Sequence, residues 1–294
     1  MLKGTLEQIV HESKGIVGLA AKHLQTGEEV SINENRLFPL ASVFKVPVLA
    51  EFFRQVETGR LQLDQRVTFT ANDRIPGSGV MQLFDSGASL TFKDLATLMI
   101  VVSDNAATDK ILDGVGIEQV NRLMSEMGMA NSQIRYNCWK LLSLYVGMDG
   151  QEPSVQTIDE WKRREQAVAA GQIRAITLES QENNVSTVTD MNMLLERIAK
   201  KEVISVSACE QMIDIMSKQQ FRNRIPYLLP AQTKVAHKTG TIGSTVNDAG
   251  IVRLPKDKGD LVISIFTEGN ESVSHGERMI ARLSRAVYDY FADK

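Results

Sequence analysis

The segment PLASVFKVPVLAEFF, residues 39–53, combines a helix signal with two side chains that can do chemistry. Ser42 and Lys45 are three residues apart, and positions i and i+3 lie on the same face of a helix. The apolar residues around them indicate a buried helix. A serine at a helix start is also an ordinary N-cap, and a lysine one turn later usually reaches for solvent. Taken alone, the pair therefore favours the structural interpretation.

The composition is typical of a folded globular protein. The chain has 294 residues, of which 43% are hydrophobic and 23% charged, with a formal net charge of −3. No run of Lys and Arg interleaved with aromatic residues could follow a phosphate backbone, so we expect no nucleic acid partner. Cys138, Cys209 and the histidines lack the spacing of a metal site, so we expect no metal, no cofactor and two free thiols.

The N-terminal sequence carries no secretory signal. Residues 1–15 alternate charged and apolar side chains, as a surface helix does, and lack the unbroken apolar core of a signal peptide. No later segment approaches the roughly twenty apolar residues of a membrane span. We therefore expect a cytoplasmic monomer that acts on a small molecule, or a periplasmic or extracellular one if a signal peptide has been replaced by Met1.

Apolar periodicity predicts strands near both ends of the chain and helices between them. A helix over residues 2–13 and a closing helix over 275–291 would flank the sheet. The predicted strands are 16–24, 28–33, 234–240, 247–254 and 260–269. Besides the Ser42 helix, the predicted internal helices are 90–102, one from about 104, 116–128, 157–170, 188–201 and 207–219. We expect an antiparallel five-stranded sheet built from both termini, with an inserted helical domain.

This pattern divides the chain into two bodies. Residues 1–60 and 218–294 would form the α/β sheet domain, and residues 61–217 the helical domain, with the site in the cleft between them. Residues 145–185 are polar and charged, which is typical of a lid or elaborated loop. A helix from Thr157 within this segment would be capped by Thr157 and Asp159.

Two further stretches change the interpretation of Ser42 and Lys45. They are VVSDNAATDKIL, residues 101–112, and VAHKTGTIG, residues 235–243. Each alone has a structural explanation, as a helix cap or as a strand end beside a turn. In this order, however, Ser-x-x-Lys, Ser-Asp-Asn and Lys-Thr-Gly are the signature of class A β-lactamases and penicillin-binding proteins. From about residue 15 to 290, the chain resembles this family of penicillin-recognising serine hydrolases.

The resemblance implies an acyl-enzyme on Ser42. Lys45 would take the serine proton, which requires a neutral amine, and both burial and the nearby Lys238 would favour that form. The backbone amides of Ser42 and Thr241 would form the oxyanion hole. Ser103 would pass a proton to the leaving group.

The resemblance also implies which residues bind substrate. Asn105 would hold an amide side chain, and the Lys238–Thr239 segment would bind a carboxylate, with Gly240 and Thr241 beside it. Arg224 occupies a position where some family members carry an arginine that faces the same pocket. The other interpretation of Arg224 is a solvated side chain near a loop.

The match to the class A pattern breaks at the glutamate that activates water for deacylation. Family spacing leads to residues 137–140, where the sequence is NCWK and no carboxylate occurs. The distance from Ser103 to Lys238 is longer than in the family by roughly thirty residues, the size of a loop or lid. The insertion falls within residues 145–185. Acylation is therefore expected with slow deacylation.

Three functions remain open. The chain is either a β-lactamase-like hydrolase with slow turnover, a D-Ala-D-Ala carboxypeptidase-like penicillin-binding protein or esterase in which Lys45 serves both half-reactions, or a non-catalytic sensor that is acylated. A β-lactamase could also recruit a carboxylate from the insertion, where the candidates are Asp149, Glu152, Asp159 and Glu160. Residues 77–79, Gly-Ser-Gly, predict an open rim for a bulkier acyl group.

Overall fold

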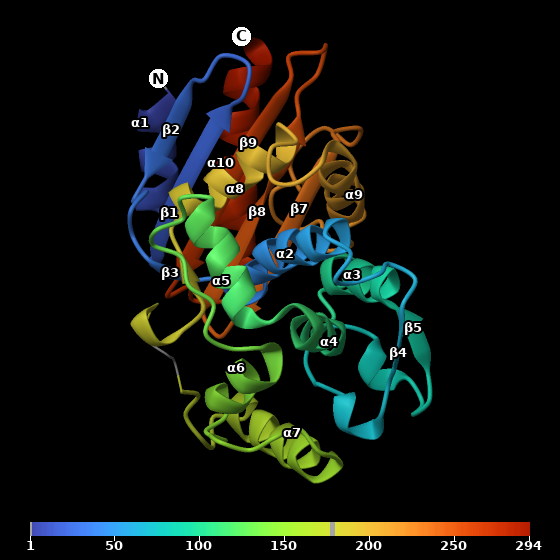
Figure 1. Ribbon diagram of the computed structural model, residues 1–294. Helices are drawn as coiled ribbons and strands as arrows, with labels where there is room; N and C mark the ends of the chain where they lie inside the picture. Colours follow the sequence, from blue (N-terminus) through green and yellow to red (C-terminus); the bar gives the residue numbers. More distant parts are fainter. Residues whose placement is uncertain (1, 177–179) are drawn as a thin grey trace.

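A five-stranded antiparallel sheet lies at the centre of the protein, with strand order β2-β1-β9-β8-β7 (Figure 1). The structure is a computed structural model and describes residues 2–176 and 180–294. The strands of the sheet are β1 (Ile16–His23), β2 (Glu29–Ile32), β7 (Val235–Ile242), β8 (Thr245–Arg253) and β9 (Asp260–Glu268). Two come from the start of the chain and three from its end, so the predicted sheet is confirmed.

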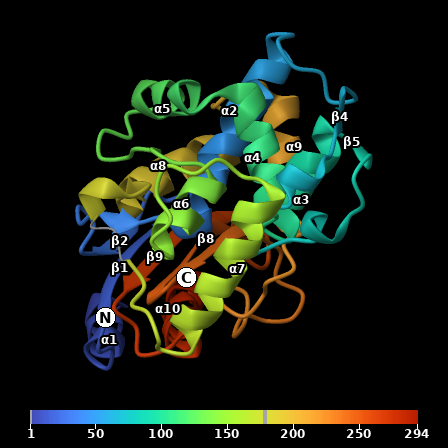
Figure 2. The ribbon, with the colours of Figure 1, turned by 90° about the horizontal axis from the view of Figure 1, so that it is seen from below.

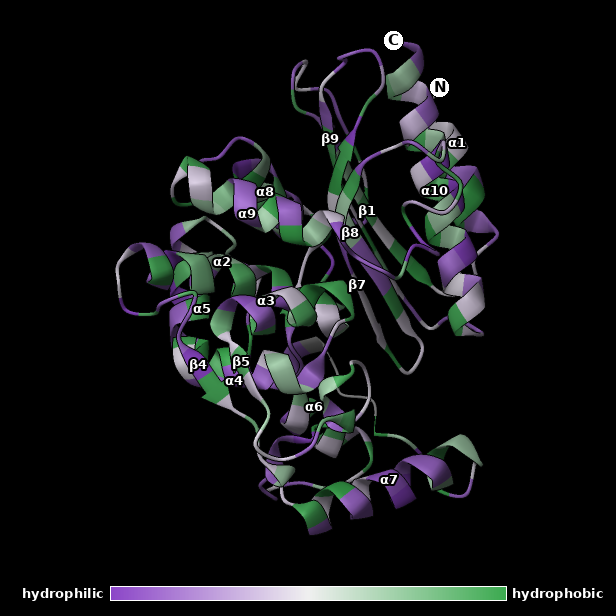
Figure 3. Ribbon diagram, turned by 90° about the vertical axis from the view of Figure 1, so that its right-hand side faces the viewer, coloured by the Kyte–Doolittle hydropathy of each residue, from purple (hydrophilic) through white to green (hydrophobic). Residues whose placement is uncertain are grey.

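Helices cover both faces of the sheet (Figure 3). Helices α1 and α10 lie on one face, and α8, α9 and α2 on the other. Successive residues of β1 accordingly enter different cores, Leu19 toward α10 and Ala20 toward α2 and α8. The helices are α1 (Leu2–His11), α2 (Lys45–Glu57), α3 (Phe92–Val101), α4 (Asn105–Val115), α5 (Ile117–Glu126), α6 (Cys138–Tyr145), α7 (Val155–Ala169), α8 (Val188–Ala199), α9 (Val206–Ser217) and α10 (Val273–Asp293).

The closing helix α10 shows how an apolar sequence pattern predicts a helix that packs on the sheet. Its apolar positions recur at helical spacing and all of them are buried against the sheet and α1: Met279, Ile280, Leu283, Val287 and Phe291. Fully burying a side chain of this size contributes about 1.5–3 kcal/mol each. The stripe therefore fixes both the helix and the face of the sheet that it covers.

Short elements complete the chain between the main ones. The 3₁₀ turns are η1 (Ala41–Phe44), η2 (Ala71–Asp73), η3 (Met81–Leu83) and η4 (Ser180–Glu182). The short strands pair as β3 (Phe38–Pro39) with β6 (Val185–Ser186) and β4 (Arg66–Thr68) with β5 (Ser89–Thr91). Since β3 leads directly into η1, its pairing with β6 fixes the chain just before Ser42.

The inserted region differs from its prediction in two respects. Helix α6 was not predicted, and α7 begins at Val155 with Ser154 as its cap, whose side chain accepts from the Thr157 amide, so the caps expected at Thr157 and Asp159 are wrong. Helix α7 is tied to α6 by Trp161, whose Nε1 donates to the Leu142 carbonyl, and both Ile158 and Trp161 are buried. Figures 1 and 3 place α6 and α7 below the end of the sheet where β7 meets β8.

The cysteines, candidate membrane spans and candidate metal sites complete the description of the fold. Cys138 and Cys209 are both free and buried. Over residues 2–176 and 180–294, no helix has both the length and the apolar character to cross a membrane. In the same ranges, no group of three or more His, Cys, Asp and Glu is arranged to hold a metal ion.

Candidate active site

Ser42 lies in the 3₁₀ turn η1, immediately before α2. The N-cap of α2 is Phe44, and neither η1 nor α2 has a side-chain cap hydrogen bond, so the capping interpretation of Ser42 is wrong. The preceding Ala41 has a φ of 44°, in the left-handed region that non-glycine residues rarely adopt. Strained backbone of this kind persists only where the surrounding structure holds it, and it concentrates at functional sites.

Strand β7 approaches the backbone of η1 so closely that only glycine fits at Gly240. A Cβ added there would lie 2.9 Å from the Ser42 nitrogen and 2.7 Å from the Leu40 carbonyl oxygen. The Asn247 amide on β8 donates to the Pro39 carbonyl at 2.7 Å and holds the entry to the turn. The Lys-Thr-Gly strand therefore lies directly against Ser42.

A buried network joins the three motifs behind Ser42. Lys45 Nζ donates to the Ser103 carbonyl at 2.7 Å, to Ser103 Oγ at 3.2 Å and to Asn105 Oδ1 at 2.8 Å. Lys238 Nζ donates to the same Ser103 Oγ at 2.9 Å and to the Thr239 carbonyl at 2.7 Å. One serine hydroxyl thus connects both lysine amines, although the motifs lie far apart in sequence.

Burial weakens the positive charge of both lysines. Each is fully buried. Burial lowers the pKa of Lys45 below its ordinary value. It lowers the pKa of Lys238 well below the ordinary value, and the positive charges of Lys45 and Arg224 lower it further. Both amines contact the same buried hydroxyl. Because burial lowers their pKa values, it favours the neutral forms, which can accept protons.

Asp104, the middle residue of Ser-Asp-Asn, positions its neighbours. One carboxylate oxygen accepts from the Ala107 amide and caps α4, while the other accepts from the amides of Val80 and Met81. Ser103 has a φ of 56°, which turns the chain between α3 and α4. Asp104 therefore fixes the turn that presents Ser103, and it also holds the loop at Val80 and Met81.

Arg224 is neither solvated nor in the cleft. It is 5% exposed, and Nη1 donates to the carbonyls of Gly240 at 2.8 Å and Asn247 at 2.7 Å. Its Nη2 donates to Thr241 Oγ1 and forms a 3.3 Å ion pair with Glu277. The solvated interpretation is thus wrong, because Arg224 is buried and supports β7 beside Thr241, which lines the cleft. Binding of a substrate carboxylate by Arg224 stays a prediction.

An open cleft of about 460 Å³ gives access to Ser42. Its lining residues are Ala41, Ser42, Phe44, Gly77, Ser78, Asn105, Cys138, Leu141, Leu142, Tyr145, Trp161, Glu165, Thr241, Ile242, Gly243 and Val273. Of the predicted site residues, Ser42, Asn105 and Thr241 line the cleft. The remaining ones lie behind its surface, namely Lys45, Ser103, Thr239, Lys238, Gly240 and Arg224.

Cys138 lies in the cleft where family spacing leads to the missing glutamate. It is the first residue of α6, whose amides at Cys138 and Trp139 donate to Asp109 at 2.7 and 2.9 Å. Burial raises the pKa of the Cys138 thiol, so it stays protonated. Burial also raises the pKa of Asp109 to about 6. Neither Cys138 nor its neighbours in residues 137–140 supplies a carboxylate to the cleft.

The four carboxylates predicted as substitutes do not line the cleft. Asp149 pairs with Lys140, Asp159 with Lys162, and Glu160 with the arginines of its own helix, while Glu152 is exposed. In the part of the chain that the structure describes, the carboxylate that lines the cleft is Glu165 on α7, which was not predicted from the sequence. Its position four residues after Trp161 was a usable signal, since a large apolar residue marks the inward face of a polar helix.

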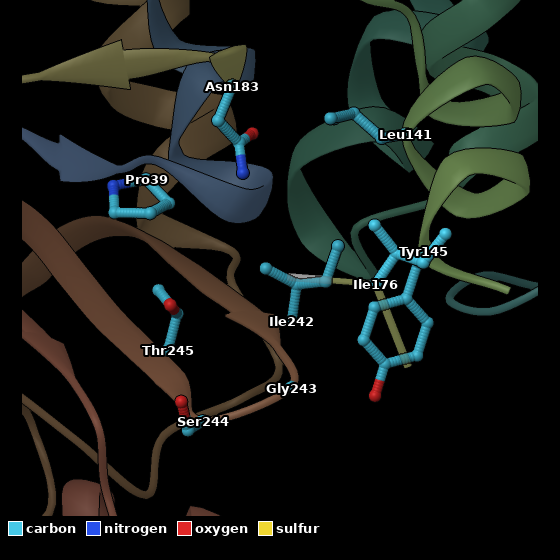
Figure 4. A pocket seen from close by; sticks show the side chains of 9 residues that line it. All are labelled: Pro39, Leu141, Tyr145, Ile176, Asn183, Ile242, Gly243, Ser244 and Thr245. Atoms are coloured by element: carbon cyan, nitrogen blue, oxygen red, sulfur yellow. The ribbon is translucent and has the colours of Figure 1, made fainter. Parts of the chain in front are cut away.

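A smaller cavity adjoins the cleft at the turn between β7 and β8 (Figure 4). Leu141, Tyr145, Ile242 and Gly243 line both spaces. Ser42 does not line the small cavity, and within residues 2–176 and 180–294 Tyr145 is its only titratable lining residue. Tyr145 therefore stands between the two spaces, and the cleft with Ser42 is the candidate active site.

Comparison with known proteins settles the family. A family model described as the beta-lactamase enzyme family matches residues 1–291. The chain belongs to the beta-lactamase enzyme family. Beta-lactamase VEB-1 of Pseudomonas aeruginosa is 24% identical over 303 residues, covering 98% of this chain and 90% of that protein. The family resemblance predicted from the three motifs is thus confirmed.

Solved structures of the family share the fold. A beta-lactamase from Sphaerobacter thermophilus superimposes with a TM-score of 0.81 at 25% identity, over 100% of this chain and 97% of that one. PBP-A gives a TM-score of 0.81 at 25% identity, over 100% and 96% of the two chains. This beta-lactamase-family chain therefore has the class A beta-lactamase-like fold, with both beta-lactamases and a penicillin-binding protein among its structural neighbours.

Proposed function

We propose that the protein is a class A β-lactamase-like serine hydrolase that forms an acyl-enzyme on Ser42 and releases it slowly. The observation that carries this proposal is the shared Ser103 hydroxyl, which lies 3.2 Å from Lys45 Nζ and 2.9 Å from Lys238 Nζ. A neutral amine, a hydroxyl and a second amine in series can move a proton from the nucleophile to a leaving group. No solvated surface lysine has this capability.

Acylation would follow from these contacts. Ser42 Oγ bonds to the substrate carbonyl carbon while its proton passes to Lys45 Nζ. The substrate carbonyl oxygen, which becomes negative, would accept hydrogen bonds from the backbone amides of Ser42 and Thr241. As the carbon–nitrogen or carbon–oxygen bond breaks, the leaving atom takes the Ser103 proton, and Lys45 returns a proton to Ser103 across their hydrogen bond. The serine proton thus ends on the leaving group, and each side chain regains its starting charge.

Deacylation would be the slow half-reaction. Water must lose a proton as it attacks the ester, and the cleft has a protonated thiol at Cys138 where the family's glutamate is expected. Lys45 is then the base within the buried network, and Glu165 on α7 is the carboxylate that lines the same cleft. This arrangement also supports the second candidate, a D-Ala-D-Ala carboxypeptidase-like penicillin-binding protein or esterase, and the similarity to PBP-A is consistent with it. A non-catalytic sensor is a third candidate.

Intact-mass spectrometry of protein mixed with benzylpenicillin tests the proposal. We expect one penicilloyl adduct that maps to Ser42, persists over many minutes, and is absent from the Ser42→Ala variant. An adduct on another residue, or no adduct and no hydrolysis, would contradict the acyl-enzyme. Complete turnover within seconds would contradict slow release. Under the sensor alternative, the adduct would form but neither lactam nor ester would ever turn over.

Other expectations from the sequence also stay predictions. They are the division into a sheet domain and a helical domain, a small β-lactam, peptide or ester as substrate, a monomeric state, and a cytoplasmic location. Size-exclusion chromatography with light scattering tests the monomer, since a dimer mass would contradict it.

A further inference from the structure

Helix α7 presents an aromatic ring and a carboxylate to the cleft. Trp161 and Glu165 are four residues apart, so they lie on one face of the helix, and both line the same space as Ser42. Trp161 is 7% exposed, and its Nε1 donates to the Leu142 carbonyl at 2.9 Å. The ring is therefore fixed between α7 and α6, and the Glu165 carboxylate is held one turn further along.

The charge pattern of α7 sets Glu165 apart from the other carboxylates of the helix. Asp159 lies 3.4 Å from Lys162, and Glu160 lies 2.9 Å from Arg163 and 2.8 Å from Arg164, so the outward-facing acids are paired. The Glu165 carboxylate has no hydrogen bond or ion pair with any residue in 2–176 or 180–294. Among those residues it is also the only charged side chain that lines the cleft.

The surroundings of Glu165 in the cleft are aromatic and apolar. Tyr145 lines the cleft from α6, and its carbonyl accepts from the Ile176 amide at 2.9 Å, which ties the end of the insertion to α6. In Figure 4 the Tyr145 ring lies beside Ile242 and Gly243 at the end of β7. Arg164 reaches the Val146 carbonyl at 3.4 Å and holds α7 against the same helix. These contacts give the cleft a rigid wall.

A carboxylate beside aromatic rings favours a cation. An ammonium group gains Coulomb attraction from the carboxylate, and the negative faces of Tyr and Trp rings add to it. An anionic group would be repelled.

We propose that Tyr145, Trp161 and Glu165 form a subsite for an ammonium group on the acyl side chain of the substrate. The inference rests on the proposed acyl-enzyme at Ser42, and it names the class of acyl donor that this site prefers. The preferred acyl group has an apolar body that ends in a primary amine. Figure 2 shows the helix that carries Trp161 and Glu165, α7, from below.

A pair of matched esters tests the subsite. One p-nitrophenyl ester has an alkanoyl chain ending in ammonium, and the other has a methyl group in place of the ammonium. We expect the wild type to prefer the cationic ester, and Glu165→Gln to lower the ratio of the two kcat/KM values about 5–10-fold, as expected for a partly exposed charge pair next to aromatic rings. Glu165→Lys should invert the ratio. Asp159→Asn, an exposed carboxylate on the same helix, is the matched control and should keep it.

Other results would overturn the subsite. An unchanged ratio of the two kcat/KM values in Glu165→Gln would show that Glu165 does not recognise the charge of the ester. Equal slowing of both esters, with accumulation of acyl-enzyme, would instead make Glu165 a base for water. Hexylammonium chloride tests the subsite without acylation: it should change tryptophan fluorescence of Ser42→Ala saturably, and not that of the variant that also carries Glu165→Gln. If hexylammonium binds but neither ester reacts, only the proposed function is contradicted. If the esters react, hexylammonium does not bind, and the ratio of the two kcat/KM values is unchanged in Glu165→Gln, only the subsite is contradicted.

Discussion

The cleft has two walls of different construction. The back wall, formed by Lys45, Ser103 and Lys238, is fully or almost fully buried, and its polar atoms are joined by hydrogen bonds. The front wall, formed by α6, α7 and the segment after them, is apolar and aromatic with one unpaired carboxylate, Glu165. Under the proposed mechanism, the back wall performs bond making, while the front wall determines how fast the product leaves and which acyl group enters.

The largest effect is expected from removing the base of the back wall. Lys45→Met keeps the length of the side chain and removes the amine, and acylation of Ser42 by benzylpenicillin should slow by about 10²–10⁴-fold, the usual contribution of a general base. Stopped-flow or quenched mass spectrometry measures the rate. Lys93→Met, at an exposed lysine on α3, is the control. Acylation at the wild-type rate in Lys45→Met would assign the proton transfer to another group.

A base added to the front wall should speed release. Cys138→Glu introduces a carboxylate at the start of α6, where it lines the cleft. The lifetime of the penicilloyl adduct should fall by about 100-fold, at the low end of general-base effects. Cys138→Gln has the same shape without the base and should leave the adduct long-lived. Equal lifetimes in the two variants would show that the missing carboxylate is not what limits deacylation.

The buried Asp109 that anchors α6 should make stability depend on pH. Its pKa is raised from 3.8 to about 6, so the folded state keeps a proton that the unfolded state has released. The stabilisation from the protonated Asp109 is complete below about pH 4. As the pH rises to about 6, the free energy of unfolding falls by on the order of 3 kcal/mol. Asp109→Asn should remove that loss. Urea unfolding of both proteins from pH 4 to pH 7 measures it, and parallel pH profiles would contradict the raised pKa.

The close approach of β7 to η1 predicts a smaller effect. Gly240→Ala would bring a Cβ to 2.7–3.0 Å from the backbone of η1, and it should cost about 1–3 kcal/mol of unfolding free energy and slow acylation. Gly4→Ala, in a helix where nothing lies within 4 Å, should instead stabilise by up to about 1 kcal/mol. Denaturant unfolding of both variants tests the pair, and a neutral Gly240→Ala would mean that β7 can retreat.

The same two walls differ in how well sequence predicted them. Three short motifs predicted which residues meet in the back wall, because the chain resembles a family that carries these motifs in this order. Helix α6 was missed because it is short and its first amides are bound by the distant Asp109, although Asn137 is a local cap whose side chain accepts from the Lys140 amide. The burial of Arg224 was not predicted, because it depends on backbone carbonyls of β7 and β8.

Glu165 escaped prediction for a similar reason. The sequence shows that α7 carries several acids, but only packing on α6 decides which of them faces inward. Other acids of the insertion, such as Asp149 and Glu160, form ion pairs with neighbouring basic side chains. Motifs thus locate the reacting atoms, and the composition of the insertion alone does not locate the side chains that select a substrate.

Pre-steady-state hydrolysis of nitrocefin tests the central claim most directly. The account predicts a rapid burst of opened lactam equal in amount to the enzyme, followed by a much slower steady phase, and no burst with Ser42→Ala. A linear trace from the first turnover at a high rate would contradict slow release from Ser42. A burst that survives in Ser42→Ala would contradict the nucleophile itself.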